Sequence, residues 1–234
     1  MVIRAVTFDH WGTLVDADHS NKGERIGFLM PYLPTTDSVQ VALAWDRSWE
    51  QFHKLLFSGL SPSTPTFLSL VLDELGVALE PDAYGRVVSY WQEAMLDAPP
   101  RLLPGVADVL EAVRGRGLRV GLISDTGVTP GNVLRERLRQ TGLLPCFDHL
   151  TFSDEIGVTK TRTYPFRHTA QALGVGPADM LHVGDLPETD IRGGRAAGCR
   201  TALLLEVSNR RDGIADADLV LDRLTDLPAA LDTL

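Results

Sequence analysis

Short, almost continuously apolar segments recur along this chain, and they predict the strands of one buried sheet. These segments are residues 2–8, 118–124, 149–152, 180–183, 201–205 and 218–221. Because they are apolar at nearly every position rather than at alternate positions, both faces of the sheet are expected to be covered, as in a parallel sheet. Helical patterns separate the later segments, at residues 105–116, 130–140, 165–173 and 189–198. This alternation predicts a doubly wound α/β fold with a parallel sheet and right-handed crossovers.

The helix predicted at residues 130–140 has sequence signals at both of its ends. Thr129 is expected to be its N-cap and Pro130 its first helical residue, and Gly142 follows its end. We therefore expect the helix to begin at residue 130.

The chain between residues 16 and 100 departs from this alternation, because it contains helical patterns but no convincing strand. Its three helical stretches are residues 37–58, 65–75 and 82–96. Proline-rich turns separate these stretches. We therefore expect a helical domain, residues 16–100, inserted into an α/β core domain formed by residues 1–15 and 101–234.

One face of the first of these helices is aromatic and apolar. Trp45, Trp49, Phe52 and Leu56 follow one another at helical spacing. A stripe of this kind is more often packed core than substrate pocket, so we expect these side chains to be buried within the helical domain.

Composition and charge exclude several classes of function. The chain is 44% apolar and 23% charged, as in an ordinary globular protein, and its net charge of −9 argues against a general nucleic-acid-binding protein. No apolar run approaches the roughly 18 residues that a membrane span requires, and no cleavable signal precedes the first strand. Cys146 and Cys199 lack metal-ligand spacing and are expected to be reduced thiols. We expect a cytoplasmic protein, monomeric or homodimeric, with no nucleic-acid or membrane partner.

Polar side chains follow four of the predicted strands. They are Asp9 after the first strand, Ser124 and Asp125 after the second, Lys160 after the third, and Asp185 and Asp190 after the fourth. Open α/β sheets bind their ligands at the carboxyl ends of the strands, so these side chains are expected to meet in one site.

The residue types at these positions suit phosphoryl transfer. The carboxylate of Asp9 can act as a nucleophile, and the hydroxyl of Ser124 with the N–H groups after it can bind phosphoryl oxygens. The ammonium of Lys160 can neutralise both the nucleophile and the transferred group. Asp185 and Asp190 together form a hard oxygen site suited to Mg²⁺.

In this order the four elements resemble the four motifs of the haloacid dehalogenase-like (HAD) hydrolases, and they span residues 6–201. The segment Asp9-His-Trp11-Gly-Thr13 resembles the first motif, which is Asp-x-Asp-Gly-Thr in the phosphatases of the family. The helical insertion resembles the family's helical cap domain. The resemblance implies a Mg²⁺-dependent hydrolase of the phosphatase type that acts on a small phosphorylated metabolite.

The resemblance also implies a role for each residue of the site. The catalytic residues would be Asp9, as the nucleophile that forms an aspartyl-phosphate intermediate, Thr13, Ser124 and Lys160. The Mg²⁺ ligands would be Asp9, the backbone carbonyl of Trp11, Asp185 and Asp190.

Trp11 departs from this pattern, because family phosphatases carry a second aspartate at that position. That aspartate protonates the leaving group and then activates water, and general acid–base catalysis of this kind contributes about 10²–10⁴-fold in rate. An indole offers only a weakly acidic N–H and cannot replace it. The backbone carbonyl is retained, so metal binding and proton transfer are expected to be separable.

Four interpretations follow from this departure. In the first, the chain is a phosphatase that favours good leaving groups, which need little protonation. In the second, it is a 2-haloacid dehalogenase, since those enzymes carry an aromatic tyrosine at this position, although they lack the paired acids Asp185 and Asp190. The third, a phosphonatase-like enzyme, would need a cap lysine, and only Lys22 and Lys54 precede the second motif. The fourth is a pseudoenzyme that binds a phosphate ligand or a partner.

Substrate binding is expected to involve residues of both domains. The candidates in the core are Ser124, Asp125 and Lys160, and those in the insertion are Lys22 and Arg25. Asp125 stands where the family often has asparagine, so its charge weakens anion binding unless the side chain is hydrogen-bonded or turned away. Alternatively, Asp125 is a surrogate acid.

Overall fold

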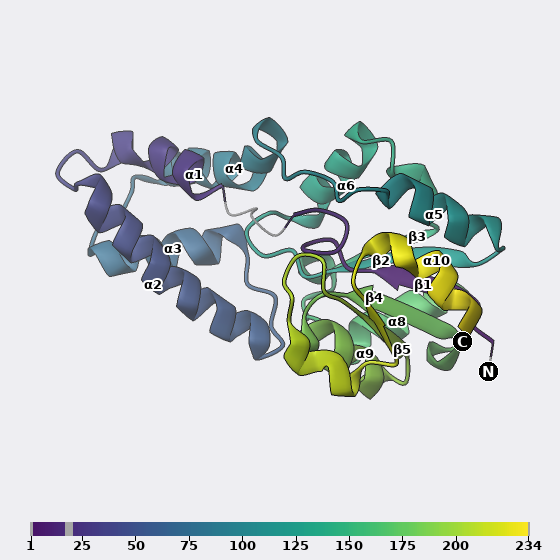
Figure 1. Ribbon diagram of the computed structural model, residues 1–234. Coiled ribbons are helices and arrows are strands. Elements are labelled where there is room, and N and C mark those ends of the chain that lie inside the picture. Colours follow the sequence, from purple (N-terminus) through teal and green to yellow (C-terminus); the bar gives the residue numbers. More distant parts are fainter. Residues whose placement is uncertain (1, 17–20, 234) are drawn as a thin grey trace.

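The computed structural model describes residues 2–16 and 21–233 and is built on one six-stranded sheet (Figure 1). Its strands are β1 (Ala5–Phe8), β2 (Arg119–Ser124), β3 (His149–Phe152), β4 (Met180–Gly184), β5 (Arg200–Leu204) and β6 (Leu219–Leu221). Neighbouring strands are parallel throughout, in the order β3-β2-β1-β4-β5-β6. The predicted doubly wound parallel sheet is confirmed.

Helices cover both faces of this sheet. On one face pack α5 (Val106–Gly115), α6 (Gly131–Gln140) and α10 (Leu227–Ala230), and on the other α8 (Tyr164–Ala172) and α9 (Arg192–Ala197). Within β1, Val6 and Phe8 belong to the hydrophobic cluster of the first face and Ala5 to that of the second, because successive strand residues point to opposite faces. The continuous apolar runs of the sequence therefore reflect a sheet that is buried on both sides.

Shorter helical segments connect these elements. They are α7 (Ser153–Ile156), a π-helical turn (Pro187–Ile191) and 3₁₀ turns at Met30–Tyr32, Leu144–Cys146, Pro177–Asp179, Arg211–Asp216, Leu224–Asp226 and Leu231–Thr233. The π-helical turn leads directly into α9 and carries Asp190.

The described part of the chain between β1 and α5 contains four α-helices, which we call the helical insert. They are α1 (Lys22–Leu29), α2 (Ser38–Phe57), α3 (Thr64–Leu75) and α4 (Pro81–Asp97), on the left in Figure 1. Phe67 lies at the centre of their hydrophobic cluster, with its ring centroid 4.6 Å from that of Trp45 and 5.7 Å from that of Trp91. The insert therefore has a hydrophobic core largely of its own.

Two expectations about helices are corrected by the structure. The sequence pattern predicts three helices in the insert, but α1 is a fourth, and its buried residues are Arg25 and Leu29. A charged residue on the buried face conceals the apolar periodicity of so short a helix. In addition, α6 begins at Gly131 with Pro130 as its N-cap, and the hydroxyl of Thr129 accepts a hydrogen bond from Arg25 at 3.0 Å instead of capping the helix.

The insert is tied to the core at the C-terminal end of α2. The hydroxyl of Thr159 donates a hydrogen bond to the carbonyl oxygen of Leu56 at 2.8 Å. The guanidinium of Arg162 donates to the carbonyl oxygen of Ser58 at 2.6 Å. The end of α2 is therefore held beside the segment that carries Lys160.

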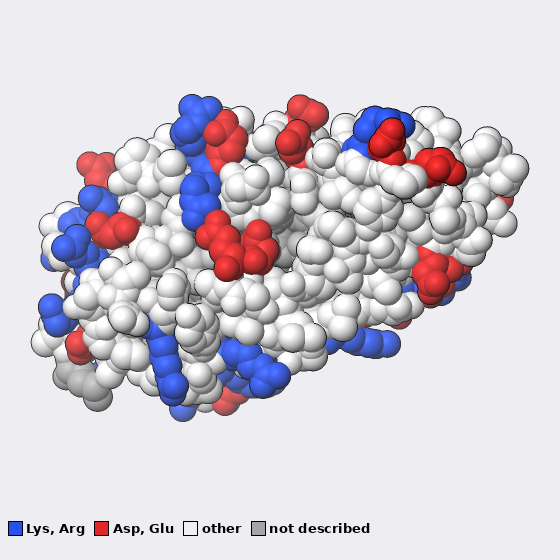
Figure 2. Space-filling view, turned by 180° about the vertical axis from the view of Figure 1, so that it is seen from behind, with Lys and Arg blue, Asp and Glu red and all other residues white. Residues whose placement is uncertain are grey.

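The surface shows no concentration of one charge on the face drawn in Figure 2. Acidic and basic side chains are interspersed there, with uncharged surface between them. Among the described residues, no helix combines the length and the apolar character that crossing a membrane would require. Cys146 and Cys199 are free thiols, as expected.

The central position of Phe67 predicts a large effect of truncating its side chain. Phe67→Ala is expected to lower the free energy of unfolding by about 3–5 kcal/mol, because the fully buried ring leaves a cavity. Urea denaturation measures this loss. Phe67→Leu is the matched control and should cost clearly less, because it fills much of the cavity. A loss below about 1 kcal/mol for Phe67→Ala, the size of an ordinary substitution, would contradict the packing described here.

Candidate active site

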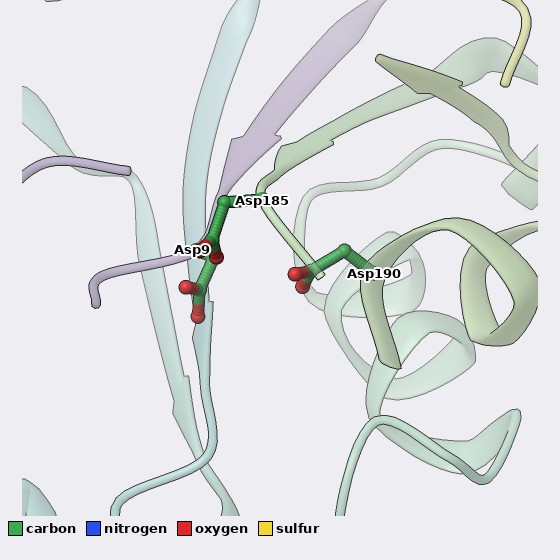
Figure 3. Close-up of side chains that lie close together, drawn as sticks. All are labelled: Asp9, Asp185 and Asp190. Carbon is green, nitrogen blue, oxygen red and sulfur yellow. The ribbon is translucent and has the colours of Figure 1, made fainter. Parts of the chain in front are cut away.

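The carboxyl ends of β1 and β4 lie at the point where the strand order of the sheet reverses, the usual ligand position in such folds. Asp9 follows β1 and Asp185 follows β4, and their carboxylates occupy one region, toward which Asp190 points (Figure 3). The backbone N–H of Asp9 donates to the carbonyl oxygen of Val183 at 2.9 Å, which fixes Asp9 to the neighbouring strand. The sheet thus brings together site residues that lie far apart in the sequence.

The turn after β1 approaches Asp185 closely because Gly12 has no side chain. The φ angle of Gly12 is +69°, in the left-handed region, and a Cβ atom there would lie 2.4 Å from Asp185 Oδ2. Thr13 follows and is fully buried. The hydroxyl oxygens of Thr13 and Ser124 are buried without a hydrogen-bond partner among the described residues.

Lys160 is buried among carboxylates. Its ammonium donates hydrogen bonds to Asp9 Oδ1 and, at 2.5 Å, to Asp190 Oδ1, and the three side chains are at most 5% exposed. The backbone holds this position from two sides. The N–H of Lys160 donates to the carboxylate of Asp125 at 3.0 Å, and its carbonyl oxygen packs so closely on Gly193 that a Cβ atom there would lie 1.9 Å away.

Asp190 is held by three donors. Its Oδ1 accepts from Lys160 and lies 3.0 Å from His182 Nε2, and its Oδ2 accepts from the N–H of Leu186 at 2.9 Å. Because a carboxylate only accepts, His182 Nε2 carries the proton, and its Nδ1 accepts from the hydroxyl of Thr7 at 2.9 Å. Burial lowers the pKa of His182, which keeps the ring neutral. His182 and Thr7 therefore orient Asp190 from beneath the site.

Burial and the crowding of charges shift the pKa values of the cluster. Burial raises the pKa of Asp185 to about 7, and the nearby charge of Asp190 adds to the rise. Burial alone would raise the pKa of Asp190, but Lys160 and His182 outweigh it and hold that pKa below its usual range. Burial alone would lower the pKa of Lys160, but the surrounding carboxylates, Asp190 foremost, raise it. Lys160 and Asp190 therefore form an ion pair, while Asp185 stays close to protonation.

Asp125 is hydrogen-bonded, which meets the condition stated for it above. Both of its oxygens face the N–H of Lys160, at 3.0 and 3.3 Å, and burial raises its pKa to about 6. Its carboxylate therefore positions the backbone of the lysine at the edge of the site.

A cavity of about 530 Å³ opens above these residues, between core and insert. Its core side includes Asp9, Trp11, Asp125, Lys160 and Asp185. Its insert side includes Arg25 of α1 and Trp49, His53, Leu56 and Phe57 of α2. The aromatic stripe of α2 is thus divided: Trp45 and Phe52 are buried in the insert, as expected, whereas Trp49 and Leu56 also face the cavity.

The structure separates the two cationic candidates of the insert. Arg25 lines the cavity, where it donates to the carbonyl oxygen of Trp91 and to Thr129, both at 3.0 Å. Lys22, in contrast, is not among the described residues that line the cavity, and its ammonium pairs with Asp46 at 2.5 Å, so its role in substrate binding stays a prediction. Thr13, Ser124 and Asp190 are buried and do not line the cavity either.

The three aspartates fit a divalent metal ion. Oxygen atoms of Asp9, Asp185 and Asp190 lie within 4.8 Å of one another, and carboxylate oxygens are the ligands that Mg²⁺ prefers. Asp185 Oδ1 is buried without a hydrogen-bond partner among the described residues, which suits a cation ligand. Asp190, in contrast, already satisfies protein donors with both oxygens.

Sequence reasoning missed His182 and the wall formed by α2. His182 is the one polar residue within the apolar segment 180–183, and that interruption is the signal that could have identified it. The position of α2 over the site depends on tertiary contacts and has no local signal.

An aspartate joined to a lysine at the switch point of a parallel sheet, beneath a helical insert, places the protein among α/β enzymes with a Rossmann-like core. The chain belongs to the haloacid dehalogenase-like hydrolases, since a sequence model of that family matches residues 3–198.

Similar proteins include both phosphatases and dehalogenases. Glyceraldehyde 3-phosphate phosphatase of Methanopyrus kandleri is 28% identical over 206 residues, which cover 86% of this chain and 83% of that protein. Phosphoserine phosphatase of Thermus thermophilus is 35% identical over 118 residues, but the match covers only 50% of this chain and 46% of that protein. The crystal structure of 2-haloacid dehalogenase from Pseudomonas syringae has a TM-score of 0.74, with 20% identity and 99% of both chains covered.

The raised pKa of Asp185 predicts a pH-dependent effect of Asp185→Asn on metal-free stability. The folded state binds the proton of Asp185 more tightly than the unfolded state does. The stabilisation of the folded state by this proton is therefore complete below pH 4 and is lost as the pH rises to about 7. In EDTA, Asp185→Asn should therefore become more stable relative to the parent as the pH rises through this window, by at most about 1.4 kcal/mol per pH unit.

Urea denaturation between pH 4 and pH 8 measures this difference. Mg²⁺ should stabilise the parent and not the variant. If the difference in free energy of unfolding between parent and variant stayed constant over this pH range, the raised pKa of Asp185 would be contradicted.

Proposed function

We propose that the protein is a Mg²⁺-dependent phosphatase that hydrolyses small phosphate monoesters through an aspartyl-phosphate on Asp9. The observation that carries the proposal is the position of Asp185, buried beside Asp9 and Lys160 with an unpartnered oxygen. Hydrolysis of a carbon–halogen bond has no need of this additional acid. Relatives named as phosphatases of small phosphorylated molecules support the same substrate class.

The metal would be held by Asp9, Asp185 and the backbone carbonyl of Trp11, with Asp190 beside them. When bound, Mg²⁺ would neutralise charge on the phosphoryl oxygens. Because the oxygens of Asp190 already accept from Lys160 and Leu186, its main task would be to hold the ammonium in place.

The residues of the chain would act in two steps. An oxygen of Asp9 attacks phosphorus, the bond from phosphorus to the leaving oxygen breaks, and that oxygen departs with the electron pair. Burial raises the pKa of Asp9, and the ammonium of Lys160 opposes that rise and so favours the ionised nucleophile. Lys160 would also stabilise the charge of the transferred group, and the hydroxyls of Thr13 and Ser124 would bind its oxygens. Water then attacks phosphorus, which releases phosphate and the carboxylate of Asp9.

The helical insert would be a cap domain in this enzyme, with residues 16–100 as its extent. Its contribution is the cavity wall of α2, which covers the reacting centre and excludes water from it. The substrate would be a small molecule, in keeping with a cavity of about 530 Å³.

Dehalogenation of a 2-haloacid is the second candidate. The observation that favours it is the aromatic Trp11 on the cavity wall, since halide leaves without a proton. The burial of Asp185 opposes it, because a further carboxylate next to Asp9 repels the carboxylate of a haloacid unless a cation lies between them.

One parallel assay separates these candidates. With Mg²⁺, the protein should release phosphate from phenyl phosphate and no halide from 2-chloropropionate, and EDTA should abolish phosphate release. Asp9→Asn should remove turnover, because an amide cannot attack phosphorus. Halide release that persists in EDTA would overturn the proposal in favour of the dehalogenase. Tight binding of a phosphate mimic without any turnover would overturn it in favour of a pseudoenzyme.

A further inference from the structure

We infer that the preferred substrates are phosphate esters of phenols or of similarly acidic hydroxyl groups carried on an apolar ring. The inference rests on the proposed function and specifies the leaving group. Two independent features carry it: each acid among the described residues of the cavity lining is already engaged in another task, and the insert side of the cavity is an aromatic wall.

The acids that line the cavity all have other tasks. Among the described residues they are Asp9, Asp125 and Asp185. Asp9 is the nucleophile, Asp185 is placed to bind the metal, and Asp125 accepts hydrogen bonds from the N–H of Lys160 with both oxygens. Trp11 occupies the position from which family phosphatases donate a proton, and its indole is not an acid at neutral pH.

His53 does not replace the missing acid. It lies on the insert side of the cavity, and burial lowers its pKa, so the ring is neutral at neutral pH. Its ring packs against Trp49, with centroids 4.8 Å apart, and against Phe57 at 6.2 Å. His53 therefore extends the aromatic wall.

The aromatic wall is suited to bind a flat apolar group. Trp49, His53, Leu56 and Phe57 follow one another on one side of α2, and Phe57 remains 47% exposed although it is large and apolar. Aromatic side chains bind planar groups by stacking and edge contacts. Arg25 adds a positive charge to the insert side of the cavity. Its guanidinium donates hydrogen bonds to Trp91 in the insert and to Thr129 in the core.

The wall is hydrogen-bonded to the segment that carries Lys160. The carbonyl oxygen of Leu56 accepts from Thr159, the residue before Lys160, and Ser58 is bound by Arg162. Because Asp9 and the wall line the same cavity, a ring on the leaving oxygen would face the wall while phosphorus faces Asp9.

The chemistry balances without a general acid. The bond from Asp9 to phosphorus forms, the bond from phosphorus to the phenolic oxygen breaks, and the electron pair leaves on a phenolate, which takes a proton from water after release. An alkoxide is far more basic and needs that proton in the transition state. In the second step water attacks phosphorus and the bond from phosphorus to Asp9 breaks, which expels the carboxylate, also a weak base. One proton of the water remains on the released phosphate and the other passes to solvent.

Three phosphate esters and one acyl phosphate test the two features separately in the presence of Mg²⁺. Phenyl phosphate has a ring and a weakly basic leaving oxygen, benzyl phosphate has a ring and an alkoxide, acetyl phosphate has a weakly basic leaving oxygen and no ring, and ethyl phosphate has neither. We expect kcat/KM for phenyl phosphate to exceed that for benzyl phosphate by about 10²–10⁴-fold. Trp11→Asp should reduce this ratio strongly, and Trp11→Phe, the matched control without an acid, should keep it.

The wall is tested by Phe57→Ala, with Leu43→Ala as the control. Leu43 is also an exposed apolar residue of α2, 52% exposed, but it does not line the cavity. Phe57→Ala should raise KM for phenyl phosphate about tenfold and leave KM for acetyl phosphate unchanged, because only the first substrate touches the ring. Leu43→Ala should change neither value.

The outcomes distinguish the two proposals. Equal kcat/KM for phenyl and benzyl phosphate, or a preference for ethyl phosphate, overturns the inference and leaves the phosphatase proposal standing. An unchanged KM for phenyl phosphate in Phe57→Ala overturns the role of the wall. Absence of phosphate release from all four compounds overturns the phosphatase proposal and the inference with it.

Discussion

The site depends on one buried ammonium. Lys160 lies among the carboxyl groups of Asp9, Asp125 and Asp190, with Asp185 next to them, and burying so many acids together is costly without a cation. The chain fixes this ammonium from several directions. Asp125 holds its backbone N–H, a glycine of α9 allows its carbonyl oxygen to pack closely, and the end of α2 is bound to the residues around it. The proposed nucleophile Asp9 and the proposed metal ligands are therefore gathered around this lysine.

The same arrangement separates two functions that usually occur together. The charged groups that the proposed phosphoryl transfer needs are present and buried, since Asp9, Lys160 and the acids Asp185 and Asp190 lie together. Under the proposed function, no described residue of the cavity is left to donate a proton, because Trp11 lies where an acid would stand and Asp125 accepts from the N–H of Lys160. Such an enzyme would stabilise the charges of phosphoryl transfer but would depend on a leaving group that departs without taking up a proton. The aromatic side of the cavity agrees with this requirement.

The sheet and the polar residues at its strand ends could be predicted from the sequence, because a buried parallel strand needs a continuous apolar run and its end is marked by the first polar residue. Local patterns failed where a residue's role depends on contacts distant in sequence. Arg25 conceals α1 because a charge on a buried face disrupts the helical pattern. The stripe of α2 reveals which side of the helix is apolar, but not that Trp49 and Leu56 face a cavity. The pairing of Lys22 with Asp46 likewise required the packed helices.

The most direct test of the account is to trap the phosphorylated intermediate. During turnover of phenyl phosphate with Mg²⁺, rapid acid quenching and peptide mass spectrometry should find a phosphoryl group on the peptide that contains Asp9. The intermediate should accumulate, because Trp11 cannot activate the water that removes it. The signal should be absent from Asp9→Asn. Phosphate release without any phosphorylated Asp9, or a phosphoryl group on another residue, would contradict the account.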